Sequence, residues 1–189
     1  MQFYVYLILA CAWVIWFAPF VFLANRSSKA QQVNRRARWG IVLQMIAYAL
    51  LWQGRFWERD VPVWKLSVAV LFFIAASLLS WSSVRALGAH WRVEAALNAD
   101  HRLVRSGPYA LVRHPVYTSM FCILLGTGLL LTPWPLFLVA IMIFLAGAGI
   151  RMGVENTLLA ARFGDEFIEY KRSVPAMIPG LPKIFLQSR

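Results

Sequence analysis

The stretch from Pro115 to Ile150, PVYTSMFCILLGTGLLLTPWPLFLVAIMIFLAGAGI, decides the fold of this chain. It contains two apolar runs, 115–131 and 136–150, separated by the four residues Thr-Pro-Trp-Pro. Two prolines so close together cannot continue a helix, because proline lacks the backbone N–H and clashes with the preceding turn. The stretch therefore predicts a tight helical hairpin whose two remaining ends lie on the same side of a membrane.

Three further apolar runs precede this hairpin. The chain is 60% hydrophobic and 15% aromatic, well above the usage of soluble domains. A helix needs about 20 apolar residues to cross a bilayer. The three runs are Phe3–Leu23, Trp39–Trp52 and Trp64–Val84, of which the second is short. The first run lacks a basic flank and a small-residue cleavage site, so we expect a retained span rather than a removed signal peptide. We predict an all-α integral membrane protein with about five transmembrane helices.

The net charge of +11 follows the predicted spans. Lys and Arg number five over 26–38, three over 55–65, five over 85–113 and six from Arg151 onward. With five spans and the N-terminus outside, 16 basic residues lie on the cytoplasmic side and three on the other. The positive-inside pattern accounts for the charge without nucleic acid. It predicts a protein of the bacterial inner membrane whose active site and C-terminus are cytoplasmic.

The predicted organisation is a single membrane domain over 1–189. It comprises three N-terminal spans (1–84), a cytoplasmic loop (85–114), the hairpin (115–150) and an amphipathic C-terminal region (151–189). In the last region, Phe163-Gly164-Asp165 indicates a helix stop followed by a new N-cap. We expect a pair of interfacial helices here, lying on the membrane.

Arg113-His114-Pro115 stands where the hairpin begins. Proline suits the first position of a helix and favours an extended residue before it. The free N–H groups and the helix dipole then make this end suitable for an anion or carboxylate, with Arg113 as a fixed charge beside it. The alternative is that Arg113 extends to lipid phosphates and His114 only caps the helix. Spacing alone leaves both open.

Arg151 and Glu155 are four residues apart and share one helix face just after the fifth span. As a surface ion pair they would contribute only about 0.3 to 0.5 kcal/mol. Because the two ends of the hairpin are neighbours, however, both residues are expected close to His114 and Tyr117. The sequence thus predicts a cation, an anion, an imidazole and a phenol at one membrane depth.

Several other kinds of chemistry have no support in the sequence. His90 and His101 lack the spacing of zinc or diiron sites, and Cys11 and Cys122 lie in apolar runs without ligand spacing, so we expect no metal and no disulfide framework. No GxSxG, Walker or GxGxxG motif is present. Membrane hydrolases and ATP-driven proteins are thereby disfavoured.

The polar residues of the C-terminal half occur in an ordered series. The series is His101-x-Leu103-Val104-x-x-Gly107-x-Tyr109, Arg113-His114-Pro115-x-Tyr117, Arg151-x-x-x-Glu155, Phe163-Gly164 and Tyr170. In order and spacing it resembles the isoprenylcysteine carboxyl methyltransferase family and its phospholipid methyltransferase relatives. The resemblance covers about the C-terminal half of the chain.

The resemblance implies S-adenosylmethionine as cofactor, in a cytoplasmic pocket formed by the loops, the ends of the last two spans and the C-terminal helices. The cofactor contacts that it implies are Glu94, His101, Arg102, Leu103, Val104, Tyr109, His114, Pro115, Val116, Tyr117 and Glu155. It also implies that Arg151 faces the methyl acceptor and carries the catalytic role. One position departs from the family pattern, because Asn156 stands where an acidic residue usually follows the matching glutamate.

We therefore expect a methyltransferase acting on a lipid or prenylated acceptor that enters from the bilayer. An isoprenylcysteine-type carboxylate is already ionised at neutral pH and needs no general base, whereas an amine would need deprotonation and a thiol a lowered pKa. The alternatives are a phospholipid amine N-methyltransferase and a small-thiol S-methyltransferase. From other classes, a non-enzymatic membrane scaffold and a sterol-type reductase compete.

Overall fold

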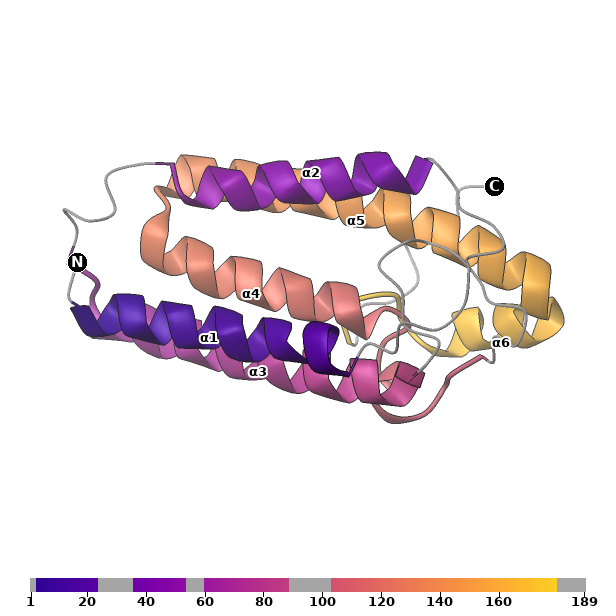
Figure 1. Cartoon of the computed structure of the whole chain (residues 1–189). Helices are drawn as coiled ribbons and strands as arrows, with labels where there is room; N and C mark the ends of the chain where they lie inside the picture. Colours follow the sequence, from indigo (N-terminus) through magenta and orange to yellow (C-terminus); the bar gives the residue numbers. More distant parts are fainter. Residues whose placement is uncertain (1–2, 24–35, 54–59, 89–102, 180–189) are drawn as a thin grey trace.

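The computed structural model describes residues 3–23, 36–53, 60–88 and 103–179, and in these ranges the regular structure is entirely helical (Figure 1). The helices are α1 (Phe3–Phe22), α2 (Arg36–Leu51), α3 (Val63–Leu87), the 3₁₀ turn η3 (Gly107–Ala110), α4 (Pro115–Leu131), α5 (Trp134–Phe163) and α6 (Asp165–Ser173). The predicted all-α class is thus confirmed, and the hairpin is α4 and α5, joined by Thr132 and Pro133.

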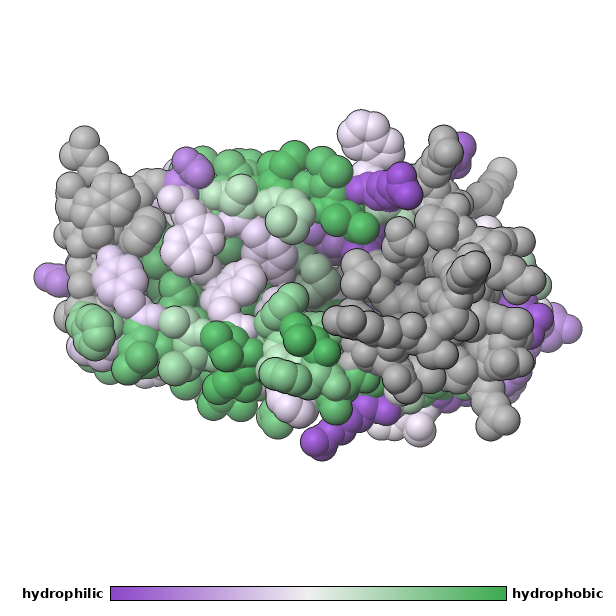
Figure 2. Space-filling model, in the orientation of Figure 1, coloured by the Kyte–Doolittle hydropathy of each residue, from purple (hydrophilic) through white to green (hydrophobic). Residues whose placement is uncertain are grey.

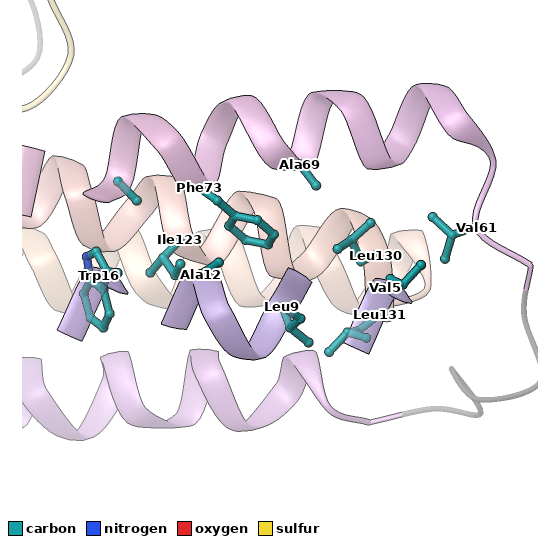
Figure 3. Close-up of a cluster of buried hydrophobic side chains, with 11 residues drawn as sticks. Val5, Leu9, Ala12, Trp16, Val61, Ala69, Phe73, Ile123, Leu130 and Leu131 are labelled. Carbon is teal, nitrogen blue, oxygen red and sulfur yellow. The ribbon is translucent and has the colours of Figure 1, made fainter. Parts of the chain in front are cut away.

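The helices form two groups with α4 between them (Figure 1). On one side α1 packs on α3 and α3 packs along α4, and on the other side α2 packs along α5. Figure 3 shows the apolar cluster between α1, α3 and α4, to which Leu9, Phe73 and Ile123 contribute. The Thr132 hydroxyl donates to the Leu51 carbonyl at 2.8 Å, which fixes the end of α2 beside the α4–α5 turn.

The outer faces of the helices are as apolar as the inner ones. In α1 the buried residues recur every three or four positions, while Val14, Phe17 and Phe22 between or after them are exposed. Figure 2 shows hydrophobic side chains covering the middle of the bundle. A helix that is apolar all round belongs in lipid. The chain is an integral membrane protein.

Three helices, α1, α3 and α5, are long and apolar enough to cross a membrane. Helices α2 and α4 lie where two further spans were predicted, but they have 16 and 17 residues and are shorter than a typical span. The prediction of five spans is therefore confirmed for three of them by length and composition.

The prediction for the C-terminal region was wrong in one respect. The span expected to end at Ile150 continues as one helix to Phe163, so no separate interfacial helix begins after Ile150. The amphipathic pattern from Arg151 onward belongs to the same helix, since no proline interrupts it and its polar face packs on other polar groups. The stop at Gly164 is confirmed, because its φ of 51° ends α5 and its N–H donates to Ala160. Helix α6 then starts at Asp165, with Gly164 and not Asp165 as the N-cap.

Candidate active site

The segment that follows α6 runs beside the start of α4 and is bonded to it. The backbone N–H groups of Arg113 and His114 donate to the carbonyls of Pro175 and Ala176 at 2.8 and 2.9 Å. One turn further along α4, the Thr118 hydroxyl donates to the Met177 carbonyl at 2.7 Å. Pro115 occupies the first position of α4, as predicted. These bonds hold the His114 backbone in place at the helix N-terminus.

Glu155 of α5 lies against the first turn of α4. Its carboxylate accepts a hydrogen bond from the Tyr117 hydroxyl, and its Oε2 is 3.3 Å from His114 Nδ1. The His114 side chain is 5% exposed, whereas that of Glu155 retains 26% exposure. The two ends of the hairpin therefore meet, and an imidazole, a phenol and a carboxylate lie in direct contact.

Asn156 completes the environment of His114. Its Oδ1 accepts from Arg113 Nη1 at 3.2 Å and lies 3.2 Å from His114 Nε2. Arg113 also donates from Nε to the Val174 carbonyl and is 8% exposed, and burial lowers the pKa of its guanidinium. His114 makes no side-chain capping bond. The alternative is therefore wrong for Arg113, which is buried and bonded to protein groups instead of reaching lipid. His114 is the N-cap residue of α4, and its side chain also contacts Glu155 and Asn156.

Arg151 is buried between α5, α4 and α2. It is 7% exposed, its guanidinium lies 5.1 Å from the centre of the Tyr117 ring, and its Nη1 donates to Gln44 Oε1 at 3.5 Å. A surface ion pair is excluded for a side chain buried in this way. With Glu155 one turn along α5, the predicted convergence of Arg151, Glu155, His114 and Tyr117 is present in the structure.

Two glycines let α2 approach α5 closely at this point. A Cβ on Gly40 would lie 2.5 Å from Arg151 Cγ and 2.6 Å from the Gly147 carbonyl oxygen. A Cβ on Gly147 would lie 2.7 Å from the Gly40 carbonyl oxygen. Small residues at a helix crossing allow backbones to touch in membranes. The crossing places Gln44, one turn after Gly40, against Arg151.

Tyr109 is tied to α6. The Tyr170 hydroxyl donates to the Tyr109 carbonyl at 2.6 Å, and Arg105 pairs with Glu166 at 3.2 Å. Burial raises the pKa of the Tyr170 phenol to about 12, against the opposing effect of Arg113 and Arg105. Tyr170 therefore stays protonated at neutral pH and keeps η3 docked on α6.

The remaining predicted cofactor residues are placed less directly. Leu103 and Val104 are half-buried in the extended segment before η3, and Val116 is half-buried in the first turn of α4. Glu94, His101 and Arg102 lie outside the described residues, as does His90. Roles for all of them stay predictions.

Sequence reasoning missed the parts played by Gln44 and Asn156. A glutamine in the middle of an apolar run is itself a signal, because uncompensated polar side chains are costly in a membrane. Asn156 departs from the family pattern, but its amide oxygen accepts a hydrogen bond from Arg113 and lies 3.2 Å from His114 Nε2. An amide oxygen can accept these bonds as a carboxylate would.

The model of the isoprenylcysteine carboxyl methyltransferase family matches residues 68–161. This segment contains Arg113, His114, Tyr117, Arg151 and Glu155. It does not contain α2.

Individual relatives agree with the family match. A protein-S-isoprenylcysteine O-methyltransferase of Schizosaccharomyces pombe is 38% identical over 85 residues, which are 45% of this chain and 36% of that protein. The human protein of the same name is 29% identical over 138 residues, or 66% of this chain and 45% of the relative. The cobalt-zinc-cadmium resistance protein CzcN of Cupriavidus metallidurans is 29% identical over 150 residues, 78% of this chain and 65% of that protein.

The matches therefore span 36% and 45% of the lengths of the two eukaryotic methyltransferases. The family model covers most of α3, all of α4 and nearly all of α5, and α4 and α5 carry most of the polar cluster. The family match and the cluster coincide in the same segment. The chain belongs to the isoprenylcysteine carboxyl methyltransferase family.

Proposed function

We propose that this protein is a membrane methyltransferase that transfers a methyl group from S-adenosylmethionine to an isoprenylcysteine-type carboxylate. The observation that carries the proposal is the buried Arg151, held one turn from the Glu155–His114–Tyr117 contact at the junction of α4 and α5. A buried cation close to a bonded carboxylate, in a membrane bundle, favours a site for charged ligands over a stabilising pair.

The polar groups at this junction suit the amino-acid end of the cofactor, which carries one ammonium and one carboxylate. Glu155 offers a partly exposed carboxylate for the ammonium, and the N-terminus of α4 beside His114 suits an anion. We assign cofactor contacts to these residues and to Tyr117, Tyr109, Pro115 and Val116, with Leu103 and Val104 in the approach. Glu94, His101 and Arg102 are included from the family pattern.

When bound, S-adenosylmethionine supplies an electrophilic methyl group on a positively charged sulfur. The acceptor carboxylate is ionised at neutral pH, so no side chain has to remove a proton. Arg151 pairs with that carboxylate through its planar two-pronged donor and fixes its direction. Alignment of this kind can supply about 7 to 11 kcal/mol of the barrier. The apolar packing around Arg151 excludes water and strengthens the pairing.

The acceptor is proposed to be lipophilic and to enter from the bilayer. Side chains on the outer faces of α2 and α5 are large and apolar, among them Met45, Ile46, Met142 and Leu145. A prenyl chain can pack against such an apolar surface while its carboxylate reaches Arg151 at the junction of α4 and α5.

The test is transfer of labelled methyl groups by the purified protein in detergent. N-acetyl-S-farnesylcysteine should become a base-labile methyl ester, and phosphatidylethanolamine should remain unlabelled. Label in phosphatidylethanolamine alone, in a small thiol alone, or in none of these acceptors would contradict the carboxylate proposal.

The orientation proposed is N-terminus outside, with the site and the C-terminus in the cytoplasm. In support, the starts of α2 and α4 and the ends of α3 and α5 lie together at the α6 end of the bundle (Figure 1). Basic residues occur in these elements: Arg36 begins α2, Arg85 is in the last turn of α3 and Arg172 is in the last turn of α6. A cysteine introduced at Ser173, in the exposed end of α6, should resist an impermeant reagent in intact cells, while one at Asp60 before α3 should react. The reverse labelling pattern would invert the topology.

A further inference from the structure

Gln44 is a buried polar residue on the packing face of α2, and the other buried residues of that helix are apolar or glycine. It is 2% exposed and shares its face of α2 with Gly40 and Ala47. A glutamine in such a place loses its water hydrogen bonds and needs protein partners to replace them. Helix α2 also lies outside the family-matched segment, which begins at residue 68. The family pattern therefore assigns no role to Gln44.

The partner of Gln44 fixes which way its amide faces. A guanidinium only donates hydrogen bonds, so Arg151 Nη1 must face the amide oxygen, Gln44 Oε1, at 3.5 Å. The amide nitrogen, Nε2, is consequently not the atom that bonds to Arg151. It is buried, and no atom of the described residues accepts a hydrogen bond from it. A buried donor left in this state is costly and calls for a missing acceptor.

The position of this donor is built into the helix crossing. A Cβ on Gly147 would lie 3.2 Å from Gln44 Cγ, so the crossing holds the glutamine stem against α5. The Arg151 guanidinium also lies 5.1 Å from the centre of the Tyr117 ring. Arg151 thus contacts a ring on α4 and an amide on α2, and the Nε2 atom of that amide is a neutral donor near the cation.

We propose that Gln44 is an acceptor-binding residue and that its amide N–H group and the Arg151 guanidinium together bind the two oxygens of a lipophilic carboxylate. This inference rests on the proposed function and deepens it, since it adds a second donor and a helix that the family match leaves out. A carboxylate offers acceptors to both groups, whereas an ammonium would meet only donors and a positive charge. The pair therefore selects carboxylates over amines.

The experiment measures binding of N-acetyl-S-farnesylcysteine and of its methyl ester to the protein in detergent, with S-adenosylhomocysteine present. Wild type should bind the acid at least about tenfold more tightly than the uncharged ester. Gln44→Met should lower the affinity for the acid about tenfold and leave the ester unchanged. Gln44→Glu should lower it further, because the new carboxylate still accepts from Arg151 but repels the ligand.

The methionine variant removes the amide N–H group, and the glutamate variant replaces it with a carboxylate that repels the acid. Affinity for the acid that stays at the wild-type value in Gln44→Met or in Gln44→Glu would overturn the inference. The control Gln53→Glu makes the same change at an exposed position just after α2 and should have no effect. Unchanged affinity for S-adenosylhomocysteine shows that each variant is folded.

Two outcomes in the wild type itself are also decisive. Equal binding of acid and ester would overturn the inference whether or not the variants fold, and would leave methyl transfer to be judged by the labelling assay. Failure of wild type to bind either compound would contradict the proposed acceptor and the role of Gln44 together.

Discussion

The two sides of the bundle treat their buried polar side chains differently. Between α1, α3 and α4, Trp13 and Trp16 donate to Thr127 and Ser119 at 3.1 and 3.2 Å, and the Ser80 hydroxyl donates to the Trp16 carbonyl at 3.0 Å. Between α2 and α5, Gln44 has a bonded oxygen and an amide nitrogen with no acceptor in the described ranges.

The difference distinguishes polar side chains that hold helices together from polar side chains that suit a ligand site. On the α1–α3–α4 side, matched donors and acceptors join helices within an apolar cluster. Ser83 of α3 is an exception, since its buried hydroxyl has no hydrogen-bond partner in the described ranges. On the α2–α5 side, the Gln44 amide lies next to the buried Arg151 cation, and a site for an anionic ligand requires such groups. Changes on the first side should lower stability, and changes on the second should lower binding or turnover.

The largest effect is expected for Arg151→Lys. Lysine keeps the charge but loses the planar two-pronged donor, so the acceptor would no longer be held in line with the methyl group, and turnover should fall about 100-fold. Affinity for S-adenosylhomocysteine should be nearly normal. Radiolabel transfer to N-acetyl-S-farnesylcysteine measures turnover, and calorimetry measures the affinity for S-adenosylhomocysteine.

The matched control for this substitution is Arg162→Lys, on an exposed turn of the same helix. It should retain wild-type turnover. Full activity of Arg151→Lys would show that the carboxylate-orienting role of Arg151 is wrong.

Glu155→Gln should weaken cofactor binding more than tenfold. The substitution removes the negative charge at a site where Asn156 cannot replace it, and losing one charge-assisted hydrogen bond costs about 1.5 to 3 kcal/mol. Calorimetry with S-adenosylhomocysteine gives the affinity directly, with Glu169→Gln on the exposed face of α6 as control. An unchanged dissociation constant would reduce Glu155 to a structural partner of His114.

Gly40→Ala tests the close crossing that supports the α2–α5 side. The added methyl group would lie 2.5 Å from Arg151 Cγ and 2.6 Å from the Gly147 carbonyl oxygen, so the helices must separate, at a cost of about 1 to 3 kcal/mol. Gly149→Ala is the control, because nothing lies within 4 Å of its added Cβ. Thermal unfolding in detergent should show a lower midpoint for Gly40→Ala alone. Equal midpoints would mean that the crossing is looser than described.

The smallest effect is expected for Ser119→Ala on the α1–α3–α4 side. It removes the acceptor of the Trp16 indole and should lower the free energy of unfolding by about 1 kcal/mol. Methyl transfer should be unchanged. If turnover fell by more than the loss of folded protein explains, the distinction between the two sides would be wrong.

Much of this arrangement could be predicted from the sequence. Apolar length and the paired prolines predict the α4–α5 hairpin, and the spacing of Arg151 and Glu155 predicts that both meet the start of α4. The length of α5 could not be predicted in this way, because amphipathic patterning does not distinguish a new interfacial helix from a continued one. Nor could the role of Gln44, since the partner of α2 depends on a glycine contact between residues distant in sequence.

The proposed methyl transfer requires a cofactor site at the junction of α4, α5 and α6. The most direct test is calorimetric titration of S-adenosylhomocysteine into the purified wild-type protein in detergent. We predict saturable binding of one molecule per chain. The absence of binding to folded protein would contradict the methyltransferase proposal and favour a membrane scaffold that keeps the fold of this family.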